Sequence, residues 1–195
     1  MRFAASLAAA ALATVAAMPA AAVQTQYVAS LSGLAESPPT GSPGTGFATV
    51  TVDSVLQSMR VEASFSGLLA GVTASHIHCC TAVPGTGTAG VATVTPTFTG
   101  FPSGVTSGTY DHNFDMALAG SFNAAFVTAN GGTAAGAFNT LVAGLDGGKA
   151  YYNIHSSQFP GGEIRGFLHA VPEPETYALM LAGLGVLGWA ARRRG

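Results

Sequence analysis

Residues 151–168, YYNIHSSQFPGGEIRGFL, predict two short strands joined by a turn. Side chains alternate across a strand, so Asn153 and His155 project to one side of the first strand. Residues 160–162, Pro-Gly-Gly, supply the turn, because glycine accepts the positive φ angles that a tight reversal needs. The hairpin gathers an imidazole, a carboxylate and a guanidinium in a chain with only 8% charged residues, which marks it as a candidate site.

The charged residues of the hairpin, Glu163 and Arg165, share one face of its second strand. Paired charges on β edges are commonly structural, so we expect a salt bridge that closes one end of the β structure. Together with Asn153 they are also candidates for a ligand-binding role.

The rest of the domain is expected to be mainly β. Further strands are predicted at residues 27–31, 47–52, 59–65, 72–78, 90–95 and 108–116. Two short helices are predicted at residues 121–127 and 133–145, the second from the helical spacing of Phe138, Leu141, Val142 and Leu145. The expected fold is an antiparallel β-sandwich or barrel with these two helices inserted.

The two ends of the chain have the composition of targeting segments. Residues 1–22 combine a short positive start, an apolar run and a small-residue end, which is typical of a secretory signal peptide. Residues 23–170 form the predicted β domain. Residues 176–191 form an apolar run that predicts a transmembrane helix, with the preceding domain outside the membrane. This run is either part of a sorting signal, as described next, or an ordinary C-terminal membrane anchor.

Residues 171–195 resemble the PEP-CTERM sorting signal of Gram-negative bacteria. The matching parts are Pro172, Glu173 and Pro174, the apolar run, and the terminal cluster Arg192, Arg193 and Arg194. The resemblance implies passage through the inner membrane and processing by an exosortase. The implied end point is the cell surface or the extracellular matrix, where an extracellular polysaccharide or a surface protein is a partner to expect.

Residues 26–169 resemble a CHRD domain. The matching stretches are LSGLAESPP at 31–39, TASHIH at 73–78, YNIH at 152–155 and GGEIRG at 161–166. The resemblance implies a secreted β-rich binding module. Departures from the family pattern are the Cys79-Cys80 pair, where a glycine-containing loop normally follows His-Ile-His, and the Ala-rich insertion.

Three histidines are candidate metal ligands. His76 and His78 are two residues apart on a predicted strand, so both imidazoles lie on one face, and His155 can join them from another strand. Such a cluster suits zinc or copper, and the His-Ile-His strand is similar to the copper strand of Cu/Zn superoxide dismutase. The alternative is structural histidines with Asn153 and Arg165 as hydrogen-bond partners. His112 is a weaker metal candidate.

Cys79 and Cys80 are the only cysteines, and three states stay open for them. They can bond to each other, bond to another chain, or provide a thiolate to a metal beside His78.

Charge and motifs exclude or disfavour other classes of function. Between residues 23 and 171, three basic and seven acidic residues leave a net charge of −4, so the basic face that nucleic-acid binding needs is missing. The sequence contains no nucleophile elbow, phosphate-binding loop or His-Glu-x-x-His motif. It therefore favours a non-enzymatic exported surface protein, with a secreted copper- or zinc-binding protein, redox-related in function, as the alternative.

Overall fold

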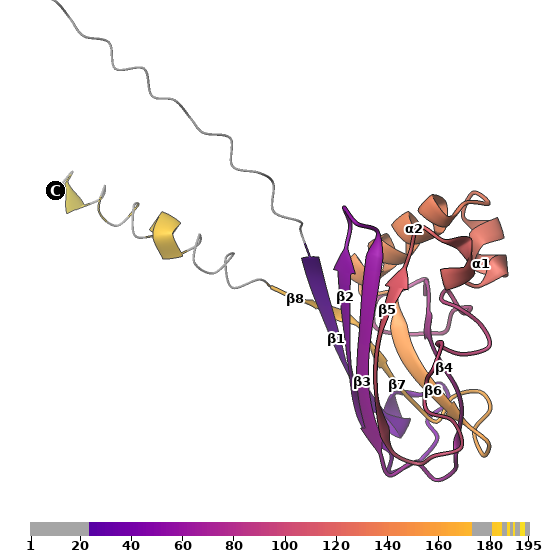
Figure 1. Cartoon of the computed structure of the whole chain (residues 1–195). Coiled ribbons are helices and arrows are strands. Elements are labelled where there is room, and N and C mark those ends of the chain that lie inside the picture. The colour runs from indigo at the N-terminus through magenta and orange to yellow at the C-terminus, as the bar shows by residue number, and fades with distance from the viewer. Residues whose placement is uncertain (1–23, 173–180, 185–186, 188, 190–191, 194–195) are drawn as a thin grey trace, which may run out of the picture.

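The computed structural model describes residues 24–172, 181–184, 187, 189 and 192–193 (Figure 1). Its strands are β1 (Gln24–Ser32), β2 (Thr45–Asp53), β3 (Ser58–Ser66), β4 (Val72–His78), β5 (Gly108–Asp115), β6 (Tyr151–Ser156), β7 (Ile164–Phe167) and β8 (His169–Val171). Its helices are α1 (Ala124–Ala129) and α2 (Ala134–Asp146), with single 3-10 turns η1 (Gly33–Ala35) and η2 (Ala119–Ser121). The predicted signal peptide lies outside the described residues, as does most of the predicted C-terminal helix. Within the described part of the chain, no helix is long and apolar enough to span a membrane.

The strands form one antiparallel sheet in the order β4-β6-β7-β1-β2-β3-β5, with β8 added to β1. The sheet curls into a half-barrel (Figure 1). The predicted mainly antiparallel fold with two short helices is confirmed. The prediction of a closed barrel or a sandwich is wrong, because β4 and β5 stand at opposite edges of the sheet and do not pair.

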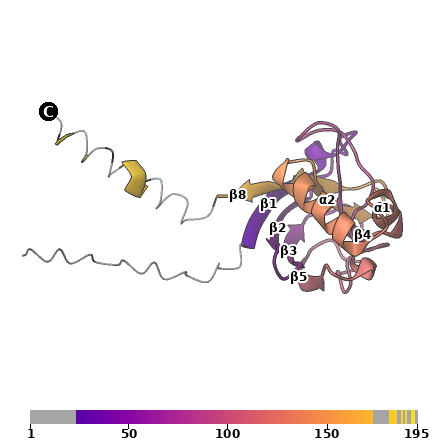
Figure 2. The ribbon, with the colours of Figure 1, turned by 90° about the horizontal axis from the view of Figure 1, so that it is seen from above.

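The helices cover the open side of the half-barrel. Seen from above, α1 and α2 lie on the side opposite β2 and β3 (Figure 2). The helical spacing predicted for α2 places Phe138, Leu141 and Leu145 in the core, each at most 3% exposed. Among the described residues, the buried core cluster runs from Tyr27 to Leu168.

Residues 90–95 do not form the predicted strand. They make only isolated bridges, from Val91 to His78 and from Thr93 to Phe122. The reason is that the Thr93 side-chain oxygen accepts the amide of Ile77 at 3.0 Å, which replaces a ladder hydrogen bond with a side-chain contact. The segment therefore packs along β4 without continuing the sheet.

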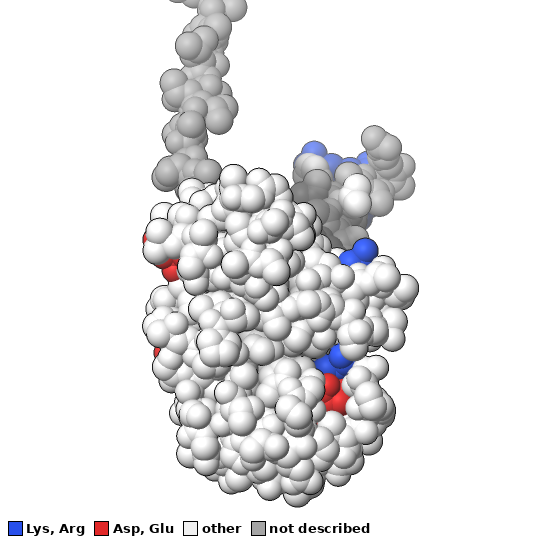
Figure 3. Space-filling model, turned by 90° about the vertical axis from the view of Figure 1, so that its right-hand side faces the viewer, with Lys and Arg blue, Asp and Glu red and all other residues white. Residues whose placement is uncertain are grey.

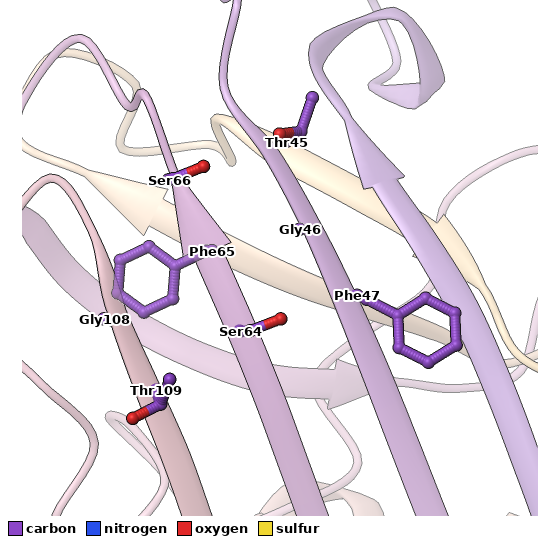
Figure 4. Close-up of a pocket in the computed structure, with 8 residues that line it drawn as sticks. All are labelled: Thr45, Gly46, Phe47, Ser64, Phe65, Ser66, Gly108 and Thr109. Atoms are coloured by element: carbon purple, nitrogen blue, oxygen red, sulfur yellow. The ribbon is translucent and has the colours of Figure 1, made fainter.

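An open groove of about 550 Å³ lies across the ends of β2, β3 and β5 (Figure 4). Two rings line it: Phe65, which is 4% exposed and belongs to the core, and Phe47, which is 46% exposed. The remaining lining side chains are small, and no titratable group is among them. The groove thus presents one exposed aromatic ring, and none of its lining side chains is an acid, a base or a metal ligand.

Candidate metal centre

The edge strand β4 and its neighbour β6 bring three histidines together. Their antiparallel register pairs Ala74 with His155 and His76 with Asn153. Because side chains alternate, His76 and His78 lie on one face, and His155 joins them from the neighbouring strand. The ligand nitrogens of the three side chains all lie within 4.8 Å of one another. The Nε2 atoms of His76 and His155 are 2.8 Å apart.

Each imidazole is oriented by a backbone carbonyl oxygen that faces its Nδ1 atom. These contacts are His76 to Pro96 at 3.3 Å, His78 to Ala89 at 2.8 Å and His155 to Pro160 at 2.9 Å. A carbonyl oxygen only accepts hydrogen bonds, so these contacts favour a proton on Nδ1 and Nε2 as the ligand nitrogen. The 2.8 Å contact between the Nε2 atoms of His76 and His155 is a hydrogen bond in the metal-free protein only when one of these two rings carries its proton on Nε2 instead. Asn153 and Arg165, the hydrogen-bond partners that the structural interpretation named, do not take this role.

The ring nitrogens of the three side chains converge, as the ligands of a metal ion do. If His76 or His155 carried its proton on Nε2 and donated it to the other ring, its own Nδ1 would be unprotonated. That Nδ1 would then face a backbone carbonyl oxygen with no proton between them. The Nε2 atom of His78 is buried and has no hydrogen-bond partner among the described residues. A cation between the three nitrogens would satisfy all of them at once, and an Nδ1–H bonded to a carbonyl is the usual outer contact of a metal-bound histidine.

Burial keeps the three imidazoles neutral. His76, His78 and His155 are each at most 9% exposed. Burial is the main cause that lowers the pKa of His76 to about 3, and the neighbouring His155 and His78 add to it. Burial likewise lowers the pKa of His78 to about 4 and lowers the pKa of His155. Neutral imidazole is the form that binds a metal ion, so the cluster is in its ligating form at neutral pH.

Arg165 lies beside the cluster but does not pair with Glu163, so the predicted salt bridge is wrong. Its Nε atom donates to the carbonyl oxygen of Ala35 at 2.6 Å and lies 3.7 Å from a carboxylate oxygen of Glu36. The guanidinium carbon lies 4.7 Å from the centre of the Tyr151 ring. Arg165 lies on β7, and η1 packs against β7. Because Glu36 directly follows η1, its carboxylate is placed beside the Arg165 guanidinium.

Glu163 fastens a loop to the sheet. One of its carboxylate oxygens accepts from the Ser42 hydroxyl at 2.7 Å and from the Leu69 amide at 2.6 Å. The residue is fully buried. These contacts hold the loop at Ser42 and the turn at Leu69 against the residue that precedes β7.

Cys79 and Cys80 form a disulfide with each other, directly after His78. Of the three states left open by the sequence, the structure shows this one, so neither sulfur is a thiolate that the histidines can share a metal with. The sulfurs pack against α2 at Gly144, where any side chain would overlap both of them.

The remaining candidates lie apart from the cluster. His112 lies on β5, opposite Val61, on the far edge of the sheet. Glu36 is the residue that the sequence analysis missed as a site candidate. Its side chain is 5% exposed, and the only sequence signal for it was a lone carboxylate in a Pro- and Ser-rich loop.

The fold and the histidine cluster describe an antiparallel β domain with a candidate metal centre. Residues 27–168 match the CHRD domain, which is more than two thirds of the chain, so the protein belongs to the CHRD family. Residues 170–194 match the PEP-CTERM protein-sorting motif. This motif implies export, membrane passage in a Gram-negative bacterium and processing by an exosortase. No curated protein and no solved structure matched the chain.

Proposed function

We propose that the protein is an exported surface protein whose CHRD domain binds one zinc or copper ion through His76, His78 and His155. The observation that carries this proposal is the convergence of three neutral imidazoles, each with its Nδ1 atom at a backbone carbonyl oxygen. Imidazole nitrogen suits zinc and copper, and outer hydrogen bonds of this kind fix the ligand nitrogen in place.

The spacing of the nitrogens is close to what a bound ion requires. Zinc–nitrogen distances of about 2.0–2.1 Å place two ligands of a tetrahedral site roughly 3.3 Å apart. The Nε2 atoms of His76 and His155 are 2.8 Å apart, so a small outward movement would admit the ion. Three protein ligands leave a fourth position for water or a small exogenous ligand.

The place of action that we propose is the cell surface or the extracellular matrix. Support comes from the order of the chain: the sorting-motif match begins at residue 170 within β8, and β8 ends at Val171, so the last strand leads directly into the Pro-Glu-Pro residues. An extracellular polysaccharide or a surface protein is the proposed partner there.

Elemental analysis of the processed protein, purified from a periplasm without chelators, tests the metal proposal. We expect one zinc or copper ion per chain, and its loss in His76→Ala and His78→Ala variants that keep the wild-type circular dichroism spectrum. His112→Ala is the matched control, because it removes a histidine outside the cluster and should leave the metal content unchanged. A Cys79→Ser/Cys80→Ser double variant should also keep its metal, because the imidazoles alone are the ligands.

Two results would overturn the proposal. One is a folded wild-type protein that stays metal-free after incubation with Zn²⁺ and with Cu²⁺. The other is full metal content in a variant that lacks both His76 and His78.

A further inference from the structure

A pocket of about 330 Å³ lies where two stretches distant in sequence meet. Its walls are residues 36–40, which follow η1, and residues 158–162, which form the turn between β6 and β7. Two hydrogen bonds hold the walls together: the Thr40 hydroxyl donates to the Glu163 carbonyl oxygen at 2.9 Å, and Arg165 donates to the Ala35 carbonyl oxygen at 2.6 Å. The pocket adjoins the histidine cluster, because the carbonyl oxygen of its wall residue Pro160 orients His155, and it is distinct from the outer groove at Phe47.

The carboxylate of Glu36 forms part of this pocket and is left half satisfied. Its Oε2 atom faces Arg165 at 3.7 Å. Its Oε1 atom is buried and has no hydrogen-bond donor among the described residues. A buried acceptor without a donor is costly, and this one belongs to a side chain that lines a cavity. It is therefore available to a donor brought by a ligand.

Gly162 keeps the floor of the pocket open. A Cβ atom at this position would lie 2.6 Å from Glu36 Oε1, 2.6 Å from Asn153 Nδ2 and 2.8 Å from Asn153 Oδ1, a second buried oxygen without a donor. The backbone of Gly162 has a φ of +127°, a region that favours glycine. The glycine thus leaves the Glu36 carboxylate and both polar atoms of the Asn153 amide unobstructed at the same place.

The charge balance selects a neutral ligand. Arg165 already compensates the Glu36 carboxylate, so a further cation would leave an uncompensated charge near a buried ion pair. An anion would face the lone pairs of Oε1. Figure 3 shows that charged side chains are sparse on the face it draws. Hydroxyl groups donate hydrogen bonds without bringing a charge.

The other walls combine uncharged polar residues, Ser37, Thr40 and Gln158, with apolar ones. The apolar residues include Pro38, Pro39 and Phe159, with Phe159 partly exposed at the rim. The face of an aromatic ring attracts partially positive C–H groups, and a binding pocket typically combines apolar walls with a few fixed polar groups. Acceptor oxygens in the floor and an aromatic rim match a molecule that has both hydroxyl groups and a C–H face.

We propose that this pocket is a binding site for a neutral sugar residue. One hydroxyl of the sugar donates to Glu36 Oε1, and its C–H face packs on Phe159. The sugar contacts named here require no bound metal ion, and the pocket shares Pro160 with the histidine cluster. The sugar is either a free monosaccharide or a residue of a neutral polysaccharide, and the experiment separates the two.

The test uses the processed, ¹⁵N-labelled protein and two kinds of probe. The first is a titration with methyl glucoside, methyl galactoside and methyl mannoside, followed by amide shifts of Phe159, Gly161 and Gly162. The second is electrophoresis in gels that contain dextran or galactomannan. We expect saturable shifts at these amides with at least one probe sugar, and retarded migration if the source is a polysaccharide.

Variants assign the response to the pocket. Phe159→Ala should abolish it, and Glu36→Gln should weaken it about tenfold, because a neutral acceptor replaces a charged one. Phe47→Ala is the matched control, since it removes an exposed phenylalanine from a different face and should change nothing. The proposal is overturned if no probe produces saturable shifts, if Phe159→Ala binds like the wild type, or if n-butylamine binds the pocket more tightly than every sugar.

Discussion

The phenol ring of Tyr151 stacks face to face on the imidazole of His78, with ring centres 4.6 Å apart and planes 6° from parallel. The Tyr151 hydroxyl also lies 3.3 Å from the carbonyl oxygen of Ala89, the same oxygen that orients His78 through Nδ1. Arg165 covers the other side of the stack at 4.7 Å. The orientation of the His78 ring is thus fixed by two contacts: Tyr151 stacks on its face, and the Ala89 carbonyl oxygen binds its Nδ1 atom.

Replacing Tyr151 should weaken metal binding without removing a ligand. We expect Tyr151→Ala to reduce the zinc or copper affinity about 10- to 100-fold, the usual effect of losing an outer contact of a metal-bound histidine. Tyr151→Phe keeps the stack and should cost much less. Competition with a chromophoric chelator measures both affinities.

Tyr110→Phe is the control for this comparison. The Tyr110 hydroxyl also donates to a backbone carbonyl, that of Thr99 at 2.9 Å, but it lies outside the histidine cluster. It should lower stability by about 1 kcal/mol and leave the affinity unchanged. An unchanged affinity in Tyr151→Ala would show that the stack does not position His78.

The stability of the metal-free protein should rise with pH between about pH 4 and pH 6.5. Burial lowers the pKa of His76 to about 3 and that of His78 to about 4, below the ordinary value of 6.5. In this range the unfolded chain binds protons that the folded histidines do not, so raising the pH favours the folded state. Urea unfolding at a series of pH values, in the presence of a chelator, measures this slope.

Glu36 opposes that trend and provides a check on it. Burial raises its pKa from 4.5 to about 7, against the effect of Arg165. Its contribution to stability is therefore present below pH 4.5 and is lost as the pH rises toward 7. Glu36→Gln should make the rise in stability between pH 4.5 and 6.5 steeper. A shallower rise would contradict the assigned direction.

Gly144 should not tolerate a side chain. An alanine Cβ atom would overlap the sulfurs of both Cys79 and Cys80. We expect Gly144→Ala to destabilise the domain by about 1–3 kcal/mol, the typical cost of overpacking, as measured by urea unfolding. Gly120→Ala is the control, because its Cβ atom would meet nothing within 4 Å. Equal stability of the two variants would mean that α2 does not pack on the disulfide.

Mass spectrometry of surface material should show a chain that ends near Pro172–Pro174. The sorting motif covers residues 170–194, so exosortase processing removes the terminal arginines. A mutation of the Pro-Glu-Pro residues to Ala should leave the full-length chain in the membrane fraction. Surface protein that still contains Arg194 would contradict the prediction.

Much of the fold follows from local patterns in the sequence. Alternation in residues 47–52 and 59–65 predicted β2 and β3, and β4 has the bounds that were expected. The same alternation placed His76 and His78 on one face. Local patterns do not show which edges of a sheet stay apart, so the half-barrel was missed. They also failed at residues 90–95, where the Thr93 side chain replaces a ladder bond.

The contacts that define the candidate sites depend on the path of loops. The carbonyl oxygens of Pro96, Ala89 and Pro160 reach the histidines from three irregular segments, and no residue type marks them in advance. The pairing of Arg165 with Glu36 joins residues that are far apart in sequence. Glu163, which seemed the natural partner by spacing, is instead taken up by Ser42.

The pairing of β8 with β1 determines how the domain would bear a mechanical load. Val171 pairs with Gln26, near the start of β1, whereas Ser32 at the other end of β1 pairs with Arg165 beside the sugar pocket. β1 therefore begins and β8 ends at one end of the half-barrel, and η1 and the turn between β6 and β7, which flank the pocket, lie at the other end (Figure 1). Ladder hydrogen bonds are perpendicular to the strands. Tension between an attached C-terminus and a ligand in the pocket would shear the three β1–β8 pairs together instead of peeling them apart one by one.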